Sequence, residues 1–427
     1  MKVLLIGSGG REHALAWTMS KSAKVSEILV APGSDAMSYV PGCRVIEIAE
    51  SDHEALKELA LAEKVDLIVP GPEGPLVEGI TDVFQEAGLR VFGPTKAAAE
   101  IEGSKEFAKK IMDRYQIPTA AYQSFSSIAE AKAYVDTCGA PIVVKADGLA
   151  AGKGVVVAET NEEAYHALDD MMTAKAFGDA GRSVVIEECL RGEELSVMAL
   201  VHGETVVPLV SAQDHKRACD GDTGPNTGGM GAYSPVPHLD ASYTDEIMQK
   251  VLRPAARGMS QEGRPFTGVL YAGLMITEKG PKVIEFNARF GDPETQVVLP
   301  RLKSDLFLAM MRILAGEEIE LDWTEESCAG VVVASSGYPG PYEKGWPFQL
   351  PSLVEPTAQQ WFHAGTTKDD ESTGGDGAWK TAGGRVLLLA TVAPALDEAV
   401  KKTYQVLEAG EWEGMYYRKD IAGKVLN

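Results

Sequence analysis

The sequence has few cysteines, a deficit of basic residues and no long apolar runs. Its 427 residues include only five cysteines, an odd number, scattered and never in a C-x-x-C pair. Neither a disulfide framework nor a zinc site is therefore expected. No apolar run approaches the ~20 residues of a membrane-spanning helix, and the chain opens directly on the strand-like run 3–6. We expect a protein of the reducing cytoplasm without an export signal or membrane anchor.

Basic residues are outnumbered by acidic ones. The 40 Lys and Arg against 62 Asp and Glu give a formal net charge of -22. This balance disfavours binding to nucleic acid, which requires a basic stripe, and binding to anionic membranes. An anionic ligand must then be held by lysines and arginines that the fold gathers locally. A composition of 45% hydrophobic and 24% charged residues is typical of a globular protein, and the length allows several folding units.

The N-terminal third has the rhythm of an α/β sheet. Short apolar runs alternate with helical patterns over residues 3–92, ending with a helical pattern over 76–87 and an apolar run over 89–92. This alternation predicts a parallel sheet wrapped by helices. The Gly-rich turn after the first run falls short of a dinucleotide fingerprint, because Glu12 stands where the third glycine would be. An anion site at Gly9 and Gly10 and a tight turn required by packing explain these residues equally well.

A second loop, Pro70 to Pro75, follows another strand-like run and contains Glu73. Parallel strands end at one edge of a sheet, so this loop is expected beside the Gly-rich turn. Glu73 could meet a hydroxyl or an amine of a ligand. A solvated carboxylate in a loop stiffened by proline and glycine explains it just as well.

A glycine- and lysine-rich loop lies between two β-branched runs over residues 141–157, which predicts strand, phosphate loop and strand. Glycines such as Gly152 free the backbone to approach an anion, while Lys145 and Lys153 supply positive charge. The loop is not a Walker loop, because it lacks the four-residue spacer and the Ser or Thr after the lysine. The alternative is an ordinary Gly-rich hairpin with solvated lysines.

Two oxygen-bearing side chains alternate at the end of a later predicted strand. Side chains at i and i+2 of a strand share a face, so Glu285 and Asn287 present a carboxylate and an amide oxygen to one point. Such hard ligands suit Mg²⁺, which keeps waters and takes other ligands from substrate phosphates. Arg289 continues the row and could brace a phosphate. Alone, the pattern also fits a solvated strand end.

Residues 213–235 have no helical or strand period and five glycines after position 220. Long irregular segments inside compact domains tend to be functional or disordered. The apolar residues Met230, Ala232 and Tyr233 favour an ordered ligand-binding loop over disorder. The chain after residue 329 shows no catalytic cluster.

Together these motifs resemble those of the phosphoribosylamine–glycine ligase family of the ATP-grasp superfamily. The resemblance spans nearly the whole chain and rests on segments 7–14, 70–76, 143–154, 221–235, 285–294 and 417–421. It implies an α/β and α+β multi-domain fold: a parallel α/β domain over 1–103, a two-part ATP-grasp domain over 104–325 with a lid at about 118–190, and a small β-rich α+β domain over 326–427.

The resemblance also implies an activity. ATP would phosphorylate the carboxylate of glycine, and the amine of 5-phosphoribosylamine would attack the acyl phosphate, a reaction of purine biosynthesis that releases ADP and phosphate. Mg²⁺, or Mn²⁺ in its place, would bind Glu285 and Asn287. The substrates are small molecules, and the protein would be a monomer or a weak homodimer. The loop 148–154 would close over ATP and exclude water.

By the same resemblance, roles pass to further residues. Lys105, Lys145 and Arg289 would balance the charge of the transferred phosphate. The nucleotide would be contacted at adenine by Glu187, Glu188, Cys189 and Leu190, at ribose by Glu194, and near the phosphates by Arg217 and Asn226. The other substrates would be contacted by Asp214, Lys216, Asp292 and Glu294. The strand 271–276 lacks the acidic metal ligand that many ATP-grasp enzymes carry there.

Three alternatives differ in class. Another ATP-grasp carboxylate–amine ligase or a biotin-dependent carboxylase would share the nucleotide site and differ in what accepts the activated carboxyl. A nucleotide sensor without turnover is disfavoured by the intact set of Lys145, Glu285, Asn287 and Arg289. A nicotinamide oxidoreductase is disfavoured by Glu12.

Overall fold

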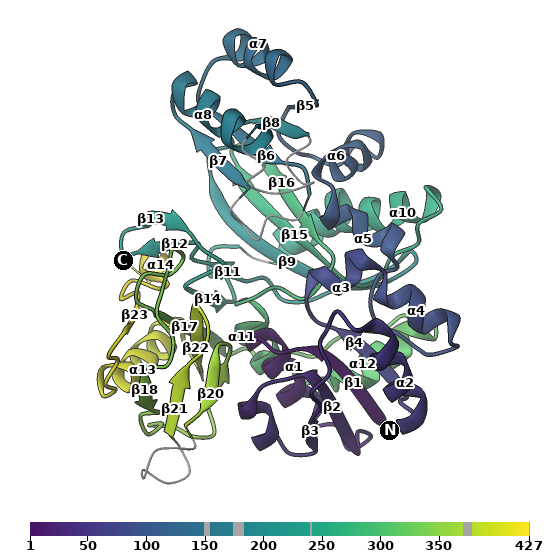
Figure 1. Ribbon diagram of the computed structural model, residues 1–427, viewed down its shortest axis with the longest axis vertical. Coiled ribbons are helices and arrows are strands. Elements are labelled where there is room, and N and C mark those ends of the chain that lie inside the picture. Colours follow the sequence, from purple (N-terminus) through teal and green to yellow (C-terminus); the bar gives the residue numbers. More distant parts are fainter. Residues whose placement is uncertain (149–153, 174–182, 240, 370–377, 427) are drawn as a thin grey trace.

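The structure is a computed structural model that describes residues 1–148, 154–173, 183–239, 241–369 and 378–426. Its N-terminal part is a parallel sheet wrapped by helices, as expected (Figure 1). The strands pair in the order β3-β2-β1-β4. The elements are β1 Lys2–Gly7, α1 Gly10–Met19, β2 Glu27–Pro32, a 3₁₀ turn Asp35–Tyr39, β3 Cys43–Val45, α2 His53–Glu63, β4 Leu67–Pro70, α3 Glu73–Glu78 and α4 Ile80–Glu86.

Two details of this sheet differ from the sequence prediction. The expected strand at 89–92 makes only a single parallel bridge, between Ile68 and Val91. The helix expected over 76–87 is two helices, because Gly79 adopts a φ of +99° and interrupts the helical backbone between α3 and α4.

Two helices lead from this sheet to a small antiparallel sheet with the order β5-β8-β6-β7, which we call the lid sheet. Ser104 caps the second helix by accepting a hydrogen bond from the Phe107 amide. The elements are α5 Lys96–Gly103, α6 Lys105–Arg114, β5 Tyr122–Phe125, α7 Ile128–Cys138, β6 Ile142–Ala146, β7 Val155–Ala158, α8 Asn161–Met172 and β8 Val184–Glu188. The expected strands around the glycine loop are present, while Gly152 and Lys153 lie outside the described residues.

A second antiparallel sheet, the central sheet, has the order β10-β9-β15-β16. Tyr271 pairs with Asn287 and Gly273 with Glu285, so strand β15 sets the position of the two expected metal ligands. The elements are β9 Glu193–His202, β10 Thr205–Pro208, α9 Ala241–Ile247, a π-helical turn Met248–Leu252, α10 Arg253–Gln261, β15 Thr267–Thr277, β16 Gly280–Asn287, α11 Thr295–Val298, a 3₁₀ turn Leu299–Arg301 and α12 Leu306–Leu314.

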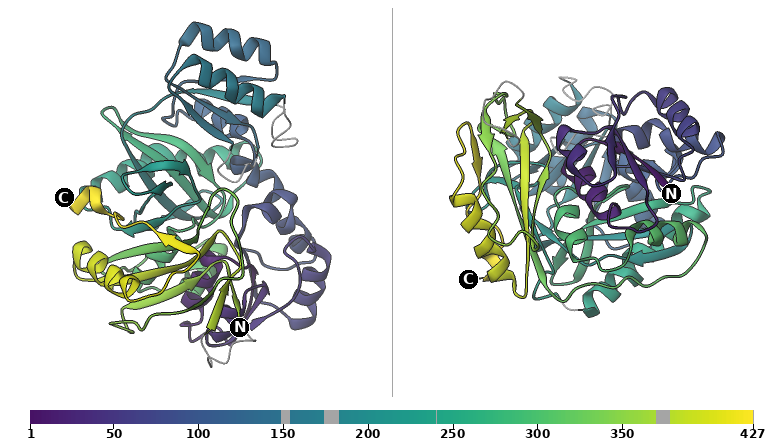
Figure 2. Two further views of the ribbon diagram at one scale, coloured as in Figure 1. Left: turned by 60° about the vertical axis from the view of Figure 1, so that its left-hand side comes forward. Right: turned by 90° about the horizontal axis from the view of Figure 1, so that it is seen from below.

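The C-terminal part contains a larger sheet, here the C-terminal sheet, with the order β11-β14-β17-β22-β19 and with β23 paired to β17. Helix α13 packs on β17 and β22 (Figure 2). A separate small sheet has the order β18-β21-β20. The elements are β17 Ser327–Ser335, β18 Pro347–Gln349, β19 Gln359–His363, β20 Thr366–Lys368, β21 Ala378–Thr381, β22 Arg385–Ala393, α13 Leu396–Glu408, β23 Met415–Tyr417 and α14 Gly423–Leu426.

The segment without a sequence period is ordered, as expected, but it folds into four short strands. These are β11 Gln213–Asp214, β12 Arg217–Cys219, β13 Thr223–Asn226 and β14 Gly231–Ser234. Strands β12 and β13 form a hairpin, whereas β14 pairs with β17, about a hundred residues later in the chain. The segment therefore joins the central sheet to the C-terminal sheet. In the part of the chain that the structure describes, no helix is long and apolar enough to cross a membrane.

The Gly-rich turn at the end of β1 encloses a carboxylate of the protein itself. Glu12 is 2% exposed and accepts hydrogen bonds from the Gly9 amide, at 2.7 Å, and from Arg11 Nε, at 2.6 Å. A Cβ atom at Gly7 or at Gly71 would overlap the Glu12 side chain. The glycines of both loops thus make room for Glu12, and the N–H group of Gly9 already has an acceptor.

Gly71→Ala should therefore destabilise the protein. The added methyl group has no space beside Glu12, and overpacking of this kind costs about 1–3 kcal/mol. Gly74→Ala is the matched control, because a Cβ atom there meets nothing within 4 Å. Chemical unfolding of both variants checks the expectation, and equal unfolding midpoints would contradict it.

Candidate functional site

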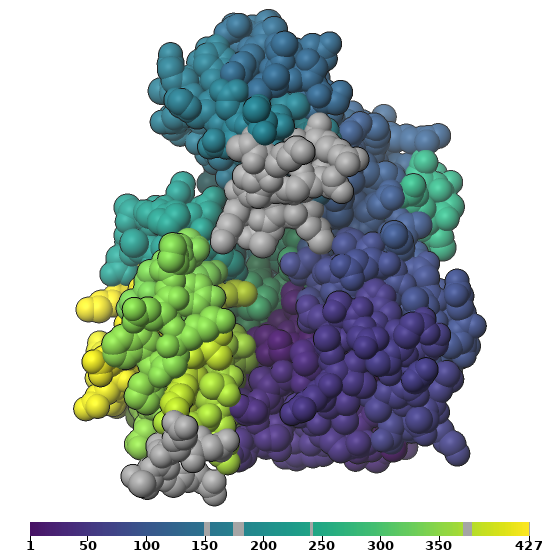
Figure 3. Space-filling model, in the orientation of Figure 1, coloured from purple at the N-terminus to yellow at the C-terminus, as the bar shows by residue number. Residues whose placement is uncertain are grey.

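A cleft of about 640 Å³ lies where the parts of the molecule meet. Figure 3 shows the surface hollowed between the N-terminal part and the C-terminal part. The N-terminal part contributes Arg11 and Glu73 to its lining, the C-terminal part contributes Tyr338 and Arg385, and the lid and central sheets supply most of the rest. The site is therefore shared by all three parts of the chain.

One end of the cleft is apolar. Its walls come from the lid sheet, the central sheet and helix α6, so a flat ligand can lie between them. The apolar residues that line it include Ala108, Met112, Val143, Val155, Val157, Leu190, Met275, Ile284 and Phe286. The segment 187–190, which the resemblance assigns to adenine, also lines the cleft.

Glu187 faces two lysines rather than solvent. Its carboxylate oxygens lie 3.0 Å from Lys145 Nζ and 3.2 Å from Lys109 Nζ, and its side chain is 4% exposed. Lys145 Nζ also donates to the Ile284 carbonyl at 2.9 Å, which ties the lid sheet to the central sheet. Burial lowers the pKa of Lys109 to about 8, against the opposing effect of Glu187. Lys109 was not among the residues expected from the sequence, although it lies one helical turn after Lys105.

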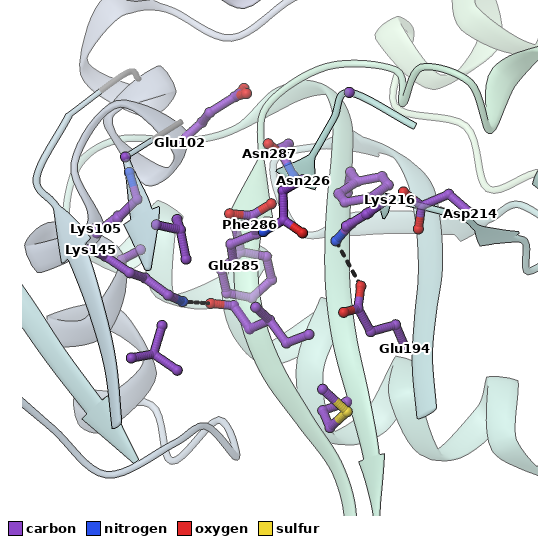
Figure 4. A pocket seen from close by; sticks show the side chains of 18 of the residues that line it. Glu102, Lys105, Lys145, Glu194, Asp214, Lys216, Asn226, Glu285, Phe286 and Asn287 are labelled. Carbon is purple, nitrogen blue, oxygen red and sulfur yellow. Dashed lines mark hydrogen bonds and ion pairs between the residues drawn. The ribbon is translucent and has the colours of Figure 1, made fainter. Parts of the chain in front are cut away.

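Glu285 and Asn287 lie between cations from several segments. Figure 4 shows Lys105 and Lys145 on one side of this pair and Lys216 on the other. Burial alone would raise the pKa of Glu285, but Lys216, Lys145 and Lys105 outweigh it and hold that pKa below its usual value. Glu285 is therefore an anion at neutral pH.

This pair fits a hard divalent cation. It offers one carboxylate and one amide oxygen, and Mg²⁺ accepts few protein ligands when waters and phosphates supply the others. The described residues contain no group of three or more His, Cys, Asp or Glu placed to hold a metal ion. A metal at Glu285 and Asn287 would thus be bound largely through its substrate and water.

Arg289 is held by two carboxylates. Its guanidinium lies 3.1 Å from Glu102 and 3.4 Å from Glu73, and Nη2 donates to the Asn287 amide oxygen at 3.2 Å. Glu102 also accepts from the Ala288 amide at 2.7 Å. Glu102 was not expected from the sequence, because nothing in helix α5 indicates that it faces residue 289, nearly two hundred positions away.

A second charged group lies across the cleft. Lys216 Nζ is 2.9 Å from Glu194, and a dashed line marks this ion pair in Figure 4. Burial raises the pKa of Asp214 to about 7, with Lys216 opposing and Glu294 adding to the rise. Burial would lower the pKa of Lys216, but Glu194 and Asp214 outweigh it and raise that pKa well above its usual value.

Glu294 lies close to these residues. It accepts hydrogen bonds from the Tyr271 hydroxyl at 2.8 Å and from Ser196 at 3.0 Å. Strand β15 carries no acid of its own at 271–276. The carboxylate of Glu294, from the segment after β16, lies against this strand instead.

The C-terminal part also lines the cleft, although the sequence shows no catalytic cluster after residue 329. Arg385 lies 2.9 Å from the Asp292 carboxylate and donates to the Gly228 carbonyl at 2.8 Å. The Gly228 amide donates to the Tyr338 hydroxyl at 3.0 Å. No local motif surrounds Tyr338 or Arg385, so the sequence held no signal for them.

Most residues singled out from the sequence line this one cleft. They are Glu73, Lys105, Lys145, Glu187, Glu188, Cys189, Leu190, Glu194, Asp214, Lys216, Arg217, Asn226, Glu285, Asn287, Arg289, Asp292 and Glu294. Gly9 and Gly10 are not among the described residues that line it, since Gly9 bonds to Glu12 and a Cβ atom at Gly10 would overlap Gln296.

Comparison with known families agrees with this three-part site. The sequence profile of phosphoribosylglycinamide synthetase matches the chain as an N domain over residues 1–102, an ATP-grasp (A) domain over 103–295 and a C domain over 328–424. The chain belongs to the phosphoribosylglycinamide synthetase family. The expected family and the expected multi-domain α/β fold are thus confirmed, and an ATP-grasp domain implies the use of ATP and a divalent metal ion.

Named relatives extend over the whole chain. The phosphoribosylamine–glycine ligase of Halalkalibacterium halodurans is 58% identical over 427 residues, which are 100% of this chain and 97% of that protein. The crystal structure of the phosphoribosylamine–glycine ligase of Thermotoga maritima, 33% identical, matches with a TM-score of 0.83 and covers 99% of this chain and 100% of that one. The biotin carboxylase of Campylobacter jejuni, 16% identical, covers 97% of this chain and 92% of that one with a TM-score of 0.73, and shares the fold alone.

The raised pKa of Asp214 predicts a pH dependence of stability. The unfolded aspartate has a pKa near 4, so between about pH 4 and pH 7 the folded state holds a proton that the unfolded state releases. The resulting stabilisation is fully present below pH 4 and is lost as the pH rises through 7. The stability advantage of Asp214→Asn over the parent should therefore be larger at pH 8 than at pH 5.

Urea unfolding at both pH values measures this difference. Asp397→Asn, on the exposed start of α13, is the control and should show the same small effect at both. A stability difference between Asp214→Asn and the parent that does not change with pH would show that Asp214 does not titrate in this range.

Proposed function

We propose that this chain joins glycine to 5-phosphoribosylamine at the expense of ATP, releasing glycinamide ribonucleotide, ADP and phosphate, a reaction of purine biosynthesis. The observation that carries the proposal is the oxygen pair of Glu285 and Asn287, faced by Lys105, Lys145 and Lys216 in one cleft. The named relatives over the full length of the chain support the choice of substrates.

ATP would lie with its base at the apolar end of the cleft. The backbone of 187–190 borders that end and would meet the edge of adenine, while Glu194 would accept from the ribose hydroxyls. Lys105 and Lys145 reach the cleft from α6 and β6 and would contact phosphate oxygens. Arg217 and Asn226, from the hairpin β12–β13, would contact the phosphates from the other side.

Glu285 and Asn287 would hold Mg²⁺, with Mn²⁺ as a possible substitute. When bound, the metal ion would neutralise charge on the phosphate oxygens of ATP. The lysines around Glu285 would also neutralise charge on these phosphate oxygens. Because these lysines keep the Glu285 carboxylate ionised, Glu285 does not have to lose a proton before it binds the metal ion.

The chemistry then consists of two displacements. A carboxylate oxygen of glycine attacks the γ-phosphorus, and the bond from phosphorus to the oxygen of ADP breaks. The carboxylate is already ionised at neutral pH and needs no base, so the enzyme positions groups and balances charge. The nitrogen of 5-phosphoribosylamine next attacks the acyl carbon, the bond to phosphate breaks, and the nitrogen gives up a proton.

The polar end of the cleft would hold glycine and the amine. Arg289 would face the transferred phosphate, and its clamp between Glu73 and Glu102 fixes it in place. Asp214, Lys216 and Asp292 would contact the remaining polar groups. Cytoplasmic location and a monomer or weak homodimer complete the proposal.

ADP release should require glycine and 5-phosphoribosylamine together. Leaving out glycine removes the acceptor of the phosphoryl group, and leaving out 5-phosphoribosylamine removes the acceptor of the acyl group. A coupled assay measures the rate of ADP release in each case. Release driven by bicarbonate would instead indicate a carboxylase, and equal rates with other amino acids would overturn the choice of glycine.

Glu285→Gln should lower kcat by roughly 10²–10⁴-fold, because the metal loses its only charged protein ligand in the proposed site. Higher Mg²⁺ concentrations should restore part of the loss. Glu278→Gln, in the exposed turn of the same hairpin β15–β16, is the control and should keep full activity. Steady-state kinetics at several Mg²⁺ concentrations decides, and near-normal turnover of Glu285→Gln would refute the ligand assignment.

A further inference from the structure

One sequence motif has no part in the site as described, the segment Tyr417–Ile421 near the end of the chain. Its arginine, Arg418, is 1% exposed and is among the largest fully buried side chains. A buried guanidinium needs partners that satisfy both its charge and its donors. Those partners are Asp420, in the same segment, and two residues of the hairpin β12–β13.

Arg418 forms a compact group of charged contacts. Nε and Nη2 donate to the two carboxylate oxygens of Asp420, at 2.8 and 2.7 Å. Nη1 lies 2.9 Å from Asp222 Oδ1 in the hairpin turn and donates to the Arg217 carbonyl at 2.9 Å. A single side chain therefore holds both the turn of the hairpin and its first strand.

Hydrogen bonds of backbone amides near Arg418 and in the hairpin add to these contacts. The Gly221 amide donates to Asp420 at 2.8 Å, and the Lys419 amide donates to Asp220 at 2.8 Å. Further along, the Ala422 amide donates to His215 Nε2 at 3.0 Å. These bonds run in both directions between the C-terminal segment and residues 215–222, so the two segments form one unit, and Figure 1 shows α14 beside β12 and β13.

The hairpin has little apolar surface of its own. Strand β13 is exposed along its whole length, and in β12 only Ala218 is buried. A hairpin without an apolar face is marginal by itself. Its position relative to the cleft must come from the segments that grip it.

The other end of the hairpin lies in the cleft. Arg217 pairs with Asn226 across the two strands, and both line the cavity. The carbonyl that accepts from Arg418 belongs to Arg217 itself, so the clamp and the cleft meet in one residue.

We propose that Arg418 is a positioning residue for nucleotide binding: it clamps the hairpin β12–β13 so that Arg217 and Asn226 face the phosphates of ATP. The proposal rests on the proposed function, which places the phosphates at these two residues. Arg418 itself contacts no substrate and acts through the backbone of Arg217 and the side chain of Asp222.

The test is a double-mutant cycle in the full-length enzyme. Arg217→Ala removes the side chain that faces ATP but keeps the carbonyl that Arg418 binds. Arg418→Met removes the clamp and keeps the buried volume. Each should raise the KM for ATP on the order of tenfold, the scale of one lost charge-assisted contact, with the KM for glycine unchanged. In the double variant the two effects should not multiply, because both act through Arg217.

Arg44→Met is the matched control, since Arg44 also binds two carboxylates, Glu27 and Glu63, but on strand β3 of the N-terminal sheet. It should leave the KM for ATP unchanged. If Arg418→Met does not fold, Asp222→Asn takes its place in the cycle. This substitution keeps the side-chain shape and weakens the contact of residue 222 with Arg418. Its effect on the KM for ATP should likewise not multiply with that of Arg217→Ala.

The outcomes separate the two proposals. An unchanged KM for ATP in Arg217→Ala would overturn the placement of the phosphates. A raised KM in Arg217→Ala together with a normal KM in Arg418→Met and in Asp222→Asn would overturn the clamp alone. Effects that multiply fully in the double variant, or a KM for glycine that rises in parallel with that for ATP, would show that Arg418 has only a general structural role.

Discussion

The site depends on the pairing of cations in the cleft with carboxylates from other elements. Lys145 of the lid sheet meets Glu187, Lys216 meets Glu194 of the central sheet, and Arg289 meets Glu102 of a linker helix. A buried cation without such a partner is costly and tends to lose its charge. A protein with a net charge of -22 can therefore keep a dense group of positive charges only where its own acids lie within ion-pair distance.

These pairs also fix the geometry of the cleft. Each joins two different segments of the chain, so the ion pairs help to set the positions of the cations. The strand β16 lies at the centre of this arrangement, since Lys145 bonds to its backbone at Ile284 and Arg289 follows its last residue. A ligand of opposite charge meets groups that are already in place, which reduces the entropy lost on binding.

Much of the fold follows from local patterns, and much of the site does not. The alternation of runs in the N-terminal part predicts its parallel sheet, and the i, i+2 pattern of Glu285 and Asn287 predicts two groups on one face of the cleft. Glu102 and Arg385 could not be predicted, because their contacts depend on how separate sheets pack. The strands β11 and β14 were equally hidden, since a glycine-rich stretch shows no alternation and β14 finds its partner only in β17.

The pairing of β14 with β17 has a consequence for how the molecule is made. During translation the N-terminal part and the central sheet emerge first. About a hundred further residues must then be synthesised before β17 can pair with β14. Until then it presents an unsatisfied backbone edge, the kind of surface that chaperones bind and that promotes aggregation. The side of the cleft that Tyr338 and Arg385 line is therefore completed only after the C-terminal sheet has been synthesised.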